Sequence, residues 1–239
     1  MGFFIETKYR SNVLEIMDDF SLKGDCLYNT LDQLATINKW LGGNRVTLNG
    51  IKKLLKNYPK NKEFTVIDLG CGNGDMLRIV YRYLKKKHYK FKLIGIDANI
   101  FTINYAKKLS KNYPEITYLQ QDVFSEDFKL LNYDLVLATL FYHHFKENEL
   151  VNLLSSQLKI AKLGIIVNDL HRHRLAYYLF KGLTLFIKNP MVKEDGLTSI
   201  LRGFKRKELY ALSEKLKANA EIKWRWAFRF QWIIKRIPK

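Results

Sequence analysis

The sequence predicts an α/β fold in which a mostly parallel, seven-stranded sheet carries helices on both faces. Three observations favour this fold. Short apolar runs that suit buried strands alternate with helix-length segments between residues 64 and 169. The first run passes directly into a turn that is rich in glycine, at residues 70–74. Residues 221–235 alternate polar with large apolar side chains, which is typical of two adjacent strands at a sheet edge.

Residues 1–60 are predicted to form an N-terminal helical cap over the mouth of the main domain. Leucine and isoleucine recur at helical spacing across residues 27–37, and the breakers Leu41–Gly42–Gly43–Asn44 end that helix. A second helix is expected at about residues 48–57, before Pro59.

The main domain is predicted to cover residues 61–239. Its first five strands are expected at residues 64–69, 91–97, 116–120, 134–139 and 163–169. The helices between these strands are expected at about residues 75–87, 100–112 and 147–160. A helical lid insertion follows strand five at about residues 171–204, and a final helix is expected at about 205–217.

Composition indicates a globular chain in a reducing compartment. Of the 239 residues, 47% are hydrophobic and only four are proline. Cys26 and Cys71 do not make a disulfide framework, so we expect a cytoplasmic protein. We expect no signal peptide, because the N-terminus lacks a basic segment followed by a long apolar one. The longest apolar stretch, residues 175–187, is interrupted by Lys181 and is too short for a transmembrane helix.

The positive charge of the chain is concentrated in its last third. Residues 151–239 contain 19 Lys and Arg against 6 Asp and Glu, and the whole chain has a net charge of +18. Such a concentration of positive charge favours an acidic partner: nucleic acid, anionic lipid, a carrier protein or an anionic substrate. The alternative is a lysine-rich surface that only contacts solvent.

An acidic residue lies at the end of each of the first three predicted strands. These residues are Asp68, Asp97 and Asp122. Ligands of open parallel sheets bind beyond the carboxyl ends of the strands. Asp97 is placed to accept hydrogen bonds from two ribose hydroxyls, and Asp122 from an exocyclic amine, with Val123 packed on the ring. The three acids therefore predict a neutral or cationic nucleoside ligand.

The glycine-rich turn has the spacing G-x-G-x-G, at Gly70, Gly72 and Gly74. It differs from the G-x-G-x-x-G of dinucleotide-binding turns. Asp68, two residues before the first glycine, would repel a pyrophosphate but suits an ammonium group. A phosphate-binding P-loop is excluded, since no Gly-Lys-Ser/Thr follows.

Four segments together resemble the successive motifs of the class I S-adenosylmethionine-dependent methyltransferases. They are Asp68–Gly74, Gly95–Asp97, Gln121–Val123 and Tyr133–Val136, and the resemblance covers roughly residues 62–170. It implies a Rossmann-like sheet whose last strand is antiparallel, and S-adenosyl-L-methionine as the cofactor. The cofactor site that it implies comprises Asp68, Gly70, Cys71, Gly72, Gly74, Asp97, Ala98, Asp122, Val123, Thr139 and, from the cap, Arg10.

The segment after strand four contains two adjacent histidines, His143 and His144. It lacks the proline motif of enzymes that methylate amino groups of nucleobases, and it lacks a cysteine nucleophile. A Leu-Phe-x-His-His run is common in small-molecule members of the family. Either histidine is a candidate general base for a phenol or carboxyl proton. The alternative is that one of them caps the following helix.

A second polar cluster follows strand five, at residues 168–174. In it, His171 is a further candidate base, with His173 as an alternative, and Arg172 or Arg174 could bind an anionic group. A solvated helix start is the other interpretation. We expect no metal site, because a third ligand is not evident. The apolar stretch 175–187 could line a pocket, pack on the core or touch a membrane.

We therefore predict an enzyme that methylates a small, apolar or aromatic acceptor, phenolic or quinone-like, at oxygen with a histidine base. The chain as a whole resembles bacterial methyltransferases of secondary metabolism. An RNA methyltransferase that docks through the basic last third is an alternative, as is a cofactor-binding module without turnover. We expect a monomer or a homodimer.

Overall fold

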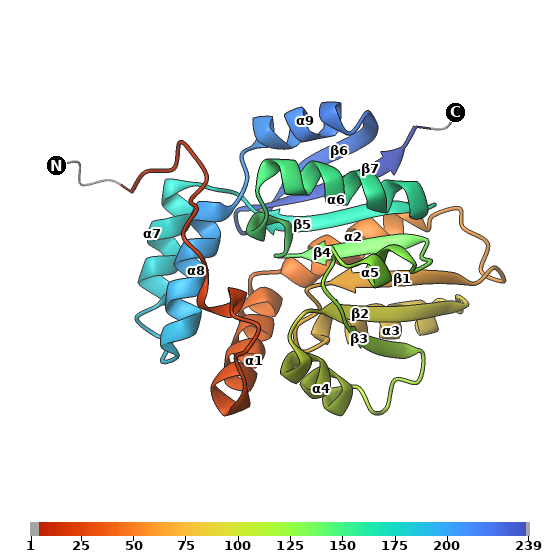
Figure 1. The fold of residues 1–239 in the computed structure, drawn as a ribbon, viewed down its shortest axis with the longest axis horizontal. Coiled ribbons are helices and arrows are strands. Elements are labelled where there is room, and N and C mark those ends of the chain that lie inside the picture. Colours follow the sequence, from red (N-terminus) through yellow and green to blue (C-terminus); the bar gives the residue numbers. More distant parts are fainter. Residues whose placement is uncertain (1–4, 238–239) are drawn as a thin grey trace.

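The computed structural model describes residues 5–237 and contains a seven-stranded sheet with the strand order β3-β2-β1-β4-β5-β7-β6 (Figure 1). The strands are β1 (Phe64–Leu69), β2 (Phe91–Asp97), β3 (Ile116–Gln120), β4 (Leu135–Thr139), β5 (Gly164–Leu170), β6 (Ala218–Arg225) and β7 (Arg229–Arg236). Strands β1 to β5 are parallel, and β7 runs antiparallel to both β5 and β6. The predicted fold class is confirmed.

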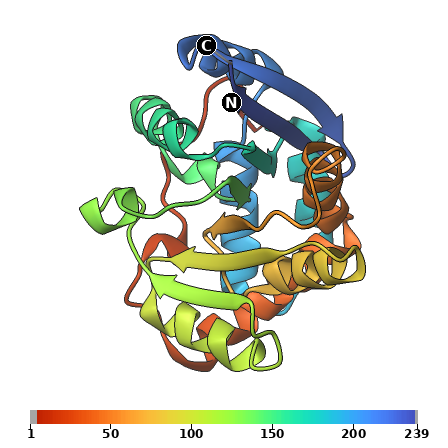
Figure 2. The same cartoon turned by 90° about the vertical axis from the view of Figure 1, so that its right-hand side faces the viewer.

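Helices cover both faces of the sheet, as Figure 2 shows from the side. One face carries α2 (Gly43–Leu54), α3 (Asp75–Lys86) and α4 (Ile100–Leu109), and the other carries α5 (Glu126–Lys129), α6 (Glu147–Ile160) and α9 (Arg206–Lys215). Side chains of a strand point alternately to opposite faces. In β4, Leu135 and Leu137 pack on the first face, while Val136 and Ala138 pack on the second. Burial on both faces explains why the strands are continuous apolar runs.

The remaining helices gather at the carboxyl ends of the parallel strands. They are α1 (Gly24–Trp40), α7 (Arg174–Leu183) and α8 (Pro190–Arg202), with short 3-10 helices η1 (Ile16–Asp18) and η2 (Tyr142–His144) beside them. In Figure 1 the red segment that precedes α1 runs alongside α8. We call this segment, residues 5–22, the N-terminal strap.

The second helix of the predicted cap packs on the sheet. Helix α2 begins at Gly43, directly after the left-handed Gly42 (φ +77°), instead of at residue 48. A side chain at Gly43 would lie 2.0 Å from Oδ1 of Asn38, so close packing against α1 requires the glycine. Gly50 likewise brings α2 close to Ile166 of β5. Of the two helices, α1 lies over the mouth of the domain; the boundary at residue 60 stays a prediction.

The predicted insertion after β5 consists of two packed helices, α7 and α8. Asn189 accepts a hydrogen bond from the backbone N–H of Val192, and Pro190 follows as the first residue of α8. That is a standard helix start, because proline needs no N–H partner in the first turn. Within residues 5–237, every helix is too short or too polar to cross a bilayer.

A buried arginine fastens the N-terminal strap to the domain. Arg172 is fully buried and donates hydrogen bonds to the backbone carbonyls of Thr7 (3.0 Å) and Lys8 (3.2 Å). The same guanidinium pairs with Glu208 at the start of α9. At Thr7 and Lys8 the strap is therefore held through its backbone.

Candidate active site

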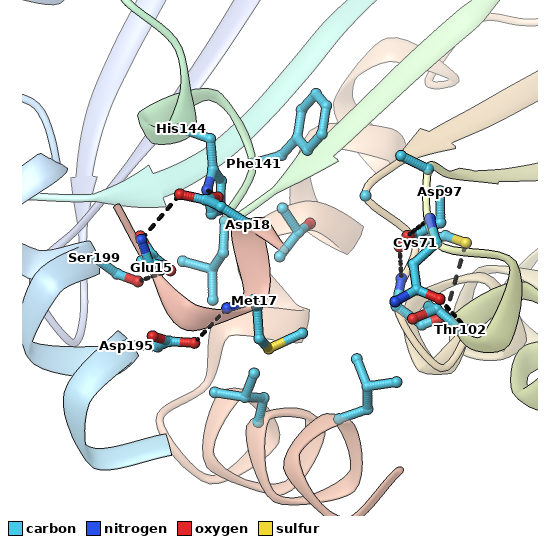
Figure 3. A pocket seen from close by; sticks show the side chains of 18 of the residues that line it. Glu15, Met17, Asp18, Cys71, Asp97, Thr102, Phe141, His144, Asp195 and Ser199 are labelled. Atoms are coloured by element: carbon cyan, nitrogen blue, oxygen red, sulfur yellow. Dashed lines mark hydrogen bonds and ion pairs between the residues drawn. The ribbon is translucent and has the colours of Figure 1, made fainter. Parts of the chain in front are cut away.

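A cavity of about 420 Å³ opens at the carboxyl ends of the strands, beneath α1, α8 and the N-terminal strap (Figure 3). In Figure 3, Cys71, Asp97 and Thr102 lie on one side of it, and the cluster around His144 lies on the opposite side. We call these the glycine-turn side and the histidine side. Apolar side chains line the cavity between them, among them Met17, Leu27, Leu31, Leu34, Phe141 and Phe145.

The glycine-rich turn adopts a backbone that favours glycine. Gly70, Gly72 and Gly74 have φ values of +63°, +53° and +77°. A Cβ at Gly70 would lie 2.5 Å from the ring of Phe141, and one at Gly74 would lie 2.1 Å from the hydroxyl of Tyr118. Gly74 precedes α3, whereas Gly70, Cys71 and Gly72 line the cavity. The turn thus lets a ligand approach its backbone closely.

Asp68 supplies a buried carboxylate at the end of β1. Burial raises its pKa well above the usual value, and the negative charges of Asp75 and Asp97 raise it further. Its Oδ1 has no hydrogen-bond partner among the described residues. Leaving a buried oxygen unpaired is costly. The site therefore fits a ligand with a cationic donor, such as an ammonium group.

Asp97, at the end of β2, is held by the backbone on both oxygens. It accepts hydrogen bonds from the N–H groups of Gly72 (3.2 Å) and Asn99 (3.0 Å). Burial raises its pKa to about 6, although these hydrogen bonds counteract the rise. Each carboxylate oxygen keeps a further lone pair, so the group suits two neighbouring hydroxyls.

Other predicted cofactor residues lie on the same wall, with one exception. Ala98, Asp122, Val123 and Thr139 line the cavity. Arg10 lies outside it, in the N-terminal strap, where its side chain donates to the backbone carbonyls of Arg202 (2.8 Å) and His143 (2.7 Å). The structure therefore does not bring Arg10 to the glycine turn.

His143 lies between two carboxylates on the histidine side. Its Nδ1 is 2.7 Å from Oδ1 of Asp169, and its Nε2 is 3.3 Å from Oε1 of Glu15. Burial lowers the pKa of the imidazole, but the two carboxylates outweigh it and raise the pKa to about 9. His143 is thus a buried cation at neutral pH. A protonated imidazole cannot accept a proton, which argues against His143 as the general base.

We expect the protein to lose stability at alkaline pH because His143 loses its proton. A group whose pKa is raised on folding stabilises the fold fully below its unfolded pKa, and this contribution disappears as the pH rises through the folded value. For His143 that range runs from 6.5 to about 9. The loss in the free energy of unfolding should be on the order of 3 kcal/mol.

Denaturant unfolding followed across this pH range measures the loss. The slope should vanish in His143→Gln and persist in the control His171→Gln. A wild-type stability that stays flat over the range would contradict the assignment of the proton to His143.

His144 forms a second pair, with Asp18 of the N-terminal strap. The two side chains meet at 2.7 Å, Nδ1 to Oδ1, and each is partly accessible to the cavity (Figure 3). Burial raises the pKa of Asp18, but hydrogen bonds from His144 and Arg202 lower it well below the usual value. The anionic Asp18 favours the tautomer with the proton on Nδ1 and leaves the lone pair on Nε2. We call this pair the His144–Asp18 dyad.

Glu15, His143 and His144 also form a cluster that could hold a metal ion, with one ligand atom from each lying within 4.8 Å of the others. The guanidinium of Arg202, however, lies 3.5 Å from Oε1 of Glu15 and 2.6 Å from Asp18. A positive charge at this position opposes a second cation. The predicted absence of a metal stays a prediction.

His171, the third candidate base, lies outside the cavity. It pairs with Phe204 in an isolated parallel bridge, and its ring packs against His173 and Phe230. Burial, followed by the positive charge of its neighbours, lowers its pKa to about 4. The structure thus separates His171 from the two adjacent histidines.

Several residues of the histidine side carry no signal in the sequence. Asp195 of α8 accepts hydrogen bonds from the backbone N–H groups of Ile16 (2.6 Å) and Met17 (3.1 Å), and Ser199 donates to Glu15 (2.8 Å). These contacts seat η1 of the strap against α8. They join residues about 180 positions apart, so no local sequence pattern predicts them.

The fold and the cavity define the class of this protein: it is an S-adenosylmethionine-dependent methyltransferase. A family model described as a methyltransferase domain matches residues 60–194, more than half of the chain. The chain belongs to this family. The class, fold and cofactor predicted from the motifs are thereby confirmed.

One curated relative is the protein-lysine N-methyltransferase EFM4 of Saccharomyces cerevisiae. It is 29% identical over 119 residues, which are 48% of this chain and 45% of the relative. The chain thus spans about half the length of the curated relative that it matches.

Solved structures share the fold over most of the chain. The plantazolicin methyltransferase BpumL, in complex with SAH, is 18% identical, with a TM-score of 0.63 over 89% of each chain. Human N-acetylserotonin methyltransferase, in complex with SAM, is 16% identical, with a TM-score of 0.64 over 92% of this chain and 58% of its own. At these identities the likeness establishes the fold alone.

Proposed function

We propose that this protein transfers the methyl group of S-adenosylmethionine to an ionisable oxygen of a small, apolar or aromatic molecule of the phenolic or quinone-like kind. The observation that carries the proposal is the His144–Asp18 dyad, which faces an apolar-lined cavity opposite the glycine turn. A base is needed at that position because a phenol is a poor nucleophile until it loses its proton.

The glycine-turn side orients the cofactor in this proposal. The unpaired Oδ1 of Asp68 binds its ammonium group, and Asp97 binds the two ribose hydroxyls. Asp122 and Val123 contact the adenine from the end of β3. When bound, the cofactor supplies an electrophilic methyl group on a sulfonium, which is a good leaving group. The protein has only to position the acceptor, exclude water and remove a proton.

The histidine side carries out the proton removal. Nε2 of His144 accepts the hydroxyl proton, and Asp18 stabilises the imidazolium that results. Arg202 holds Asp18 in its charged form through a 2.6 Å contact. His143 cannot take this role, because its two ring nitrogens face the carboxylates of Asp169 and Glu15, which keep the imidazole protonated.

The compartment and the metabolic setting belong to the same proposal. Both cysteines are free, Cys71 within the cavity wall and Cys26 on the surface. Unpaired cysteines suit a reducing compartment. We therefore place the reaction in the cytoplasm and in secondary metabolism, where apolar aromatic acceptors arise.

Methyl-labelled S-adenosylmethionine and a panel of acceptors test the proposal. The panel contains phenols, the matching methyl ethers whose oxygen is blocked, a lysine peptide and an RNA transcript. We expect label on the phenols alone, located at oxygen by mass spectrometry. The yeast relative makes the lysine peptide the informative rival. Label on the ethers, the peptide or the RNA without label on any phenol would refute oxygen transfer to a small molecule.

A further inference from the structure

Helix α7 and the turn after it expose an apolar surface. Leu175 and Leu179 are 51% and 56% exposed, and Leu183 lies one turn further along the same face. Leu185 and Phe186, which follow the helix, are 82% and 84% exposed. We call these five residues the α7 surface. Adjacent side chains of this size are seldom left in water together unless they meet a partner.

The apolar face of α7 is only partly covered by the domain. Ala176 is buried, and the ring of Phe180 packs so closely on α8 that a Cβ at Gly196 would lie 2.3 Å from it. A surface helix normally has one apolar and one polar face. In α7 the leucines extend the apolar face beyond the part that α8 covers.

The charges within the chain segment that carries the α7 surface have one sign. No Asp or Glu occurs between Asp169 and Glu194. Lys181 and Lys188 are exposed within this stretch, and Lys193 is partly exposed. A second copy of the chain docked by twofold symmetry would bring the same lysines together. An anionic surface would neutralise them.

We propose that the α7 surface docks on an anionic phospholipid bilayer. Leu185 and Phe186 enter the boundary between headgroups and acyl chains, and Lys181 and Lys188 contact the phosphates. An exposed apolar tip flanked by lysines is the combination that interfacial helices use. The net charge of +18 strengthens the attraction at long range.

Docking in this way brings the cavity close to the membrane. Helix α8 packs on the inner face of α7, and its residues Gly196 and Ser199 line the cavity. Apolar acceptors concentrate in lipid, so a docked enzyme would meet them at a higher local concentration. This consequence rests on the proposed function, whereas membrane docking itself does not.

Vesicle flotation of the full chain tests the docking. Vesicles of phosphatidylcholine containing phosphatidylglycerol should carry the protein upward, and vesicles of pure phosphatidylcholine should not. We expect the double variant Leu185→Ser/Phe186→Ser to bind the anionic vesicles at least about tenfold more weakly. Lys181→Glu/Lys188→Glu should weaken binding and reduce its dependence on salt.

Matched controls distinguish binding through the α7 surface from non-specific binding through other exposed leucines and lysines. Leu130→Ser removes another exposed leucine, and Lys86→Glu/Lys87→Glu changes the net charge equally at the end of α3. Leu130→Ser should bind like the wild type, Lys86→Glu/Lys87→Glu should lose clearly less binding than Lys181→Glu/Lys188→Glu, and all variants should bind S-adenosyl-L-homocysteine normally. Failure of the wild type to bind at low salt, or equal losses in the controls, would overturn the proposal. So would a wild-type dimer that Leu185→Ser/Phe186→Ser converts into a monomer, because two copies would then share this face.

Discussion

Replacing His144 by alanine should lower kcat for methyl transfer by about 10²–10⁴ and leave the affinity for S-adenosyl-L-homocysteine unchanged. The imidazole is the one group of the dyad that can take a proton from the acceptor, and it lies on the side of the cavity opposite the glycine turn. Steady-state kinetics with a phenolic acceptor, together with calorimetric titration of the cofactor product, measure the two quantities.

Two further variants sharpen this result. Asp18→Asn keeps the shape of the dyad but removes the charge that fixes the tautomer, so kcat should also fall. His171→Ala is the matched control, because that histidine lies outside the cavity, and its kcat should equal that of the wild type. A His144→Ala enzyme with kcat close to the wild-type value would remove the proposed base.

Asp97→Ala should weaken binding of S-adenosyl-L-homocysteine by more than about tenfold, since it removes a charged acceptor of two hydrogen bonds. The variant also frees the backbone N–H of Gly72, which Asp97 now holds at 3.2 Å in the glycine turn. Calorimetric titration gives the Kd directly.

The comparison variant for Asp97→Ala is Asp127→Ala. Asp127 is an exposed carboxylate on α5 and lies outside the cavity, so its loss should leave the Kd unchanged. An unaltered affinity in Asp97→Ala would refute the role in ribose binding.

Much of the fold could be predicted because the sheet is buried on both faces. A strand covered on both sides is largely apolar, which made β1 and β2 visible at their observed residues. The insertion after β5 was predicted to be helical, but its division into α7 and α8 was not. Pro190 begins α8, and Gly196 makes room for Phe180. Only the packing of α7 on α8 shows why residue 196 is a glycine.

The two sides of the cavity differ in how far the sequence predicts them. Asp68, Asp97 and Asp122 sit at strand ends, and parallel strands bring their ends together, so the topology alone unites them. Asp18 and His144 are 126 residues apart, and neither the sheet nor a local motif relates them. Their meeting depends on the path of the N-terminal strap.

The attachment of the strap has a consequence for how this protein tolerates change. Arg172 binds the backbone carbonyl oxygens of Thr7 and Lys8, and every residue type provides such an oxygen. Substitutions at these strap positions therefore preserve the attachment. An insertion or deletion between Lys8 and Asp18 would instead shift the register that delivers Asp18 to His144. We therefore expect positions 7 and 8 to tolerate substitution, whereas the number of residues between Lys8 and Asp18 is constrained by the contact of Asp18 with His144.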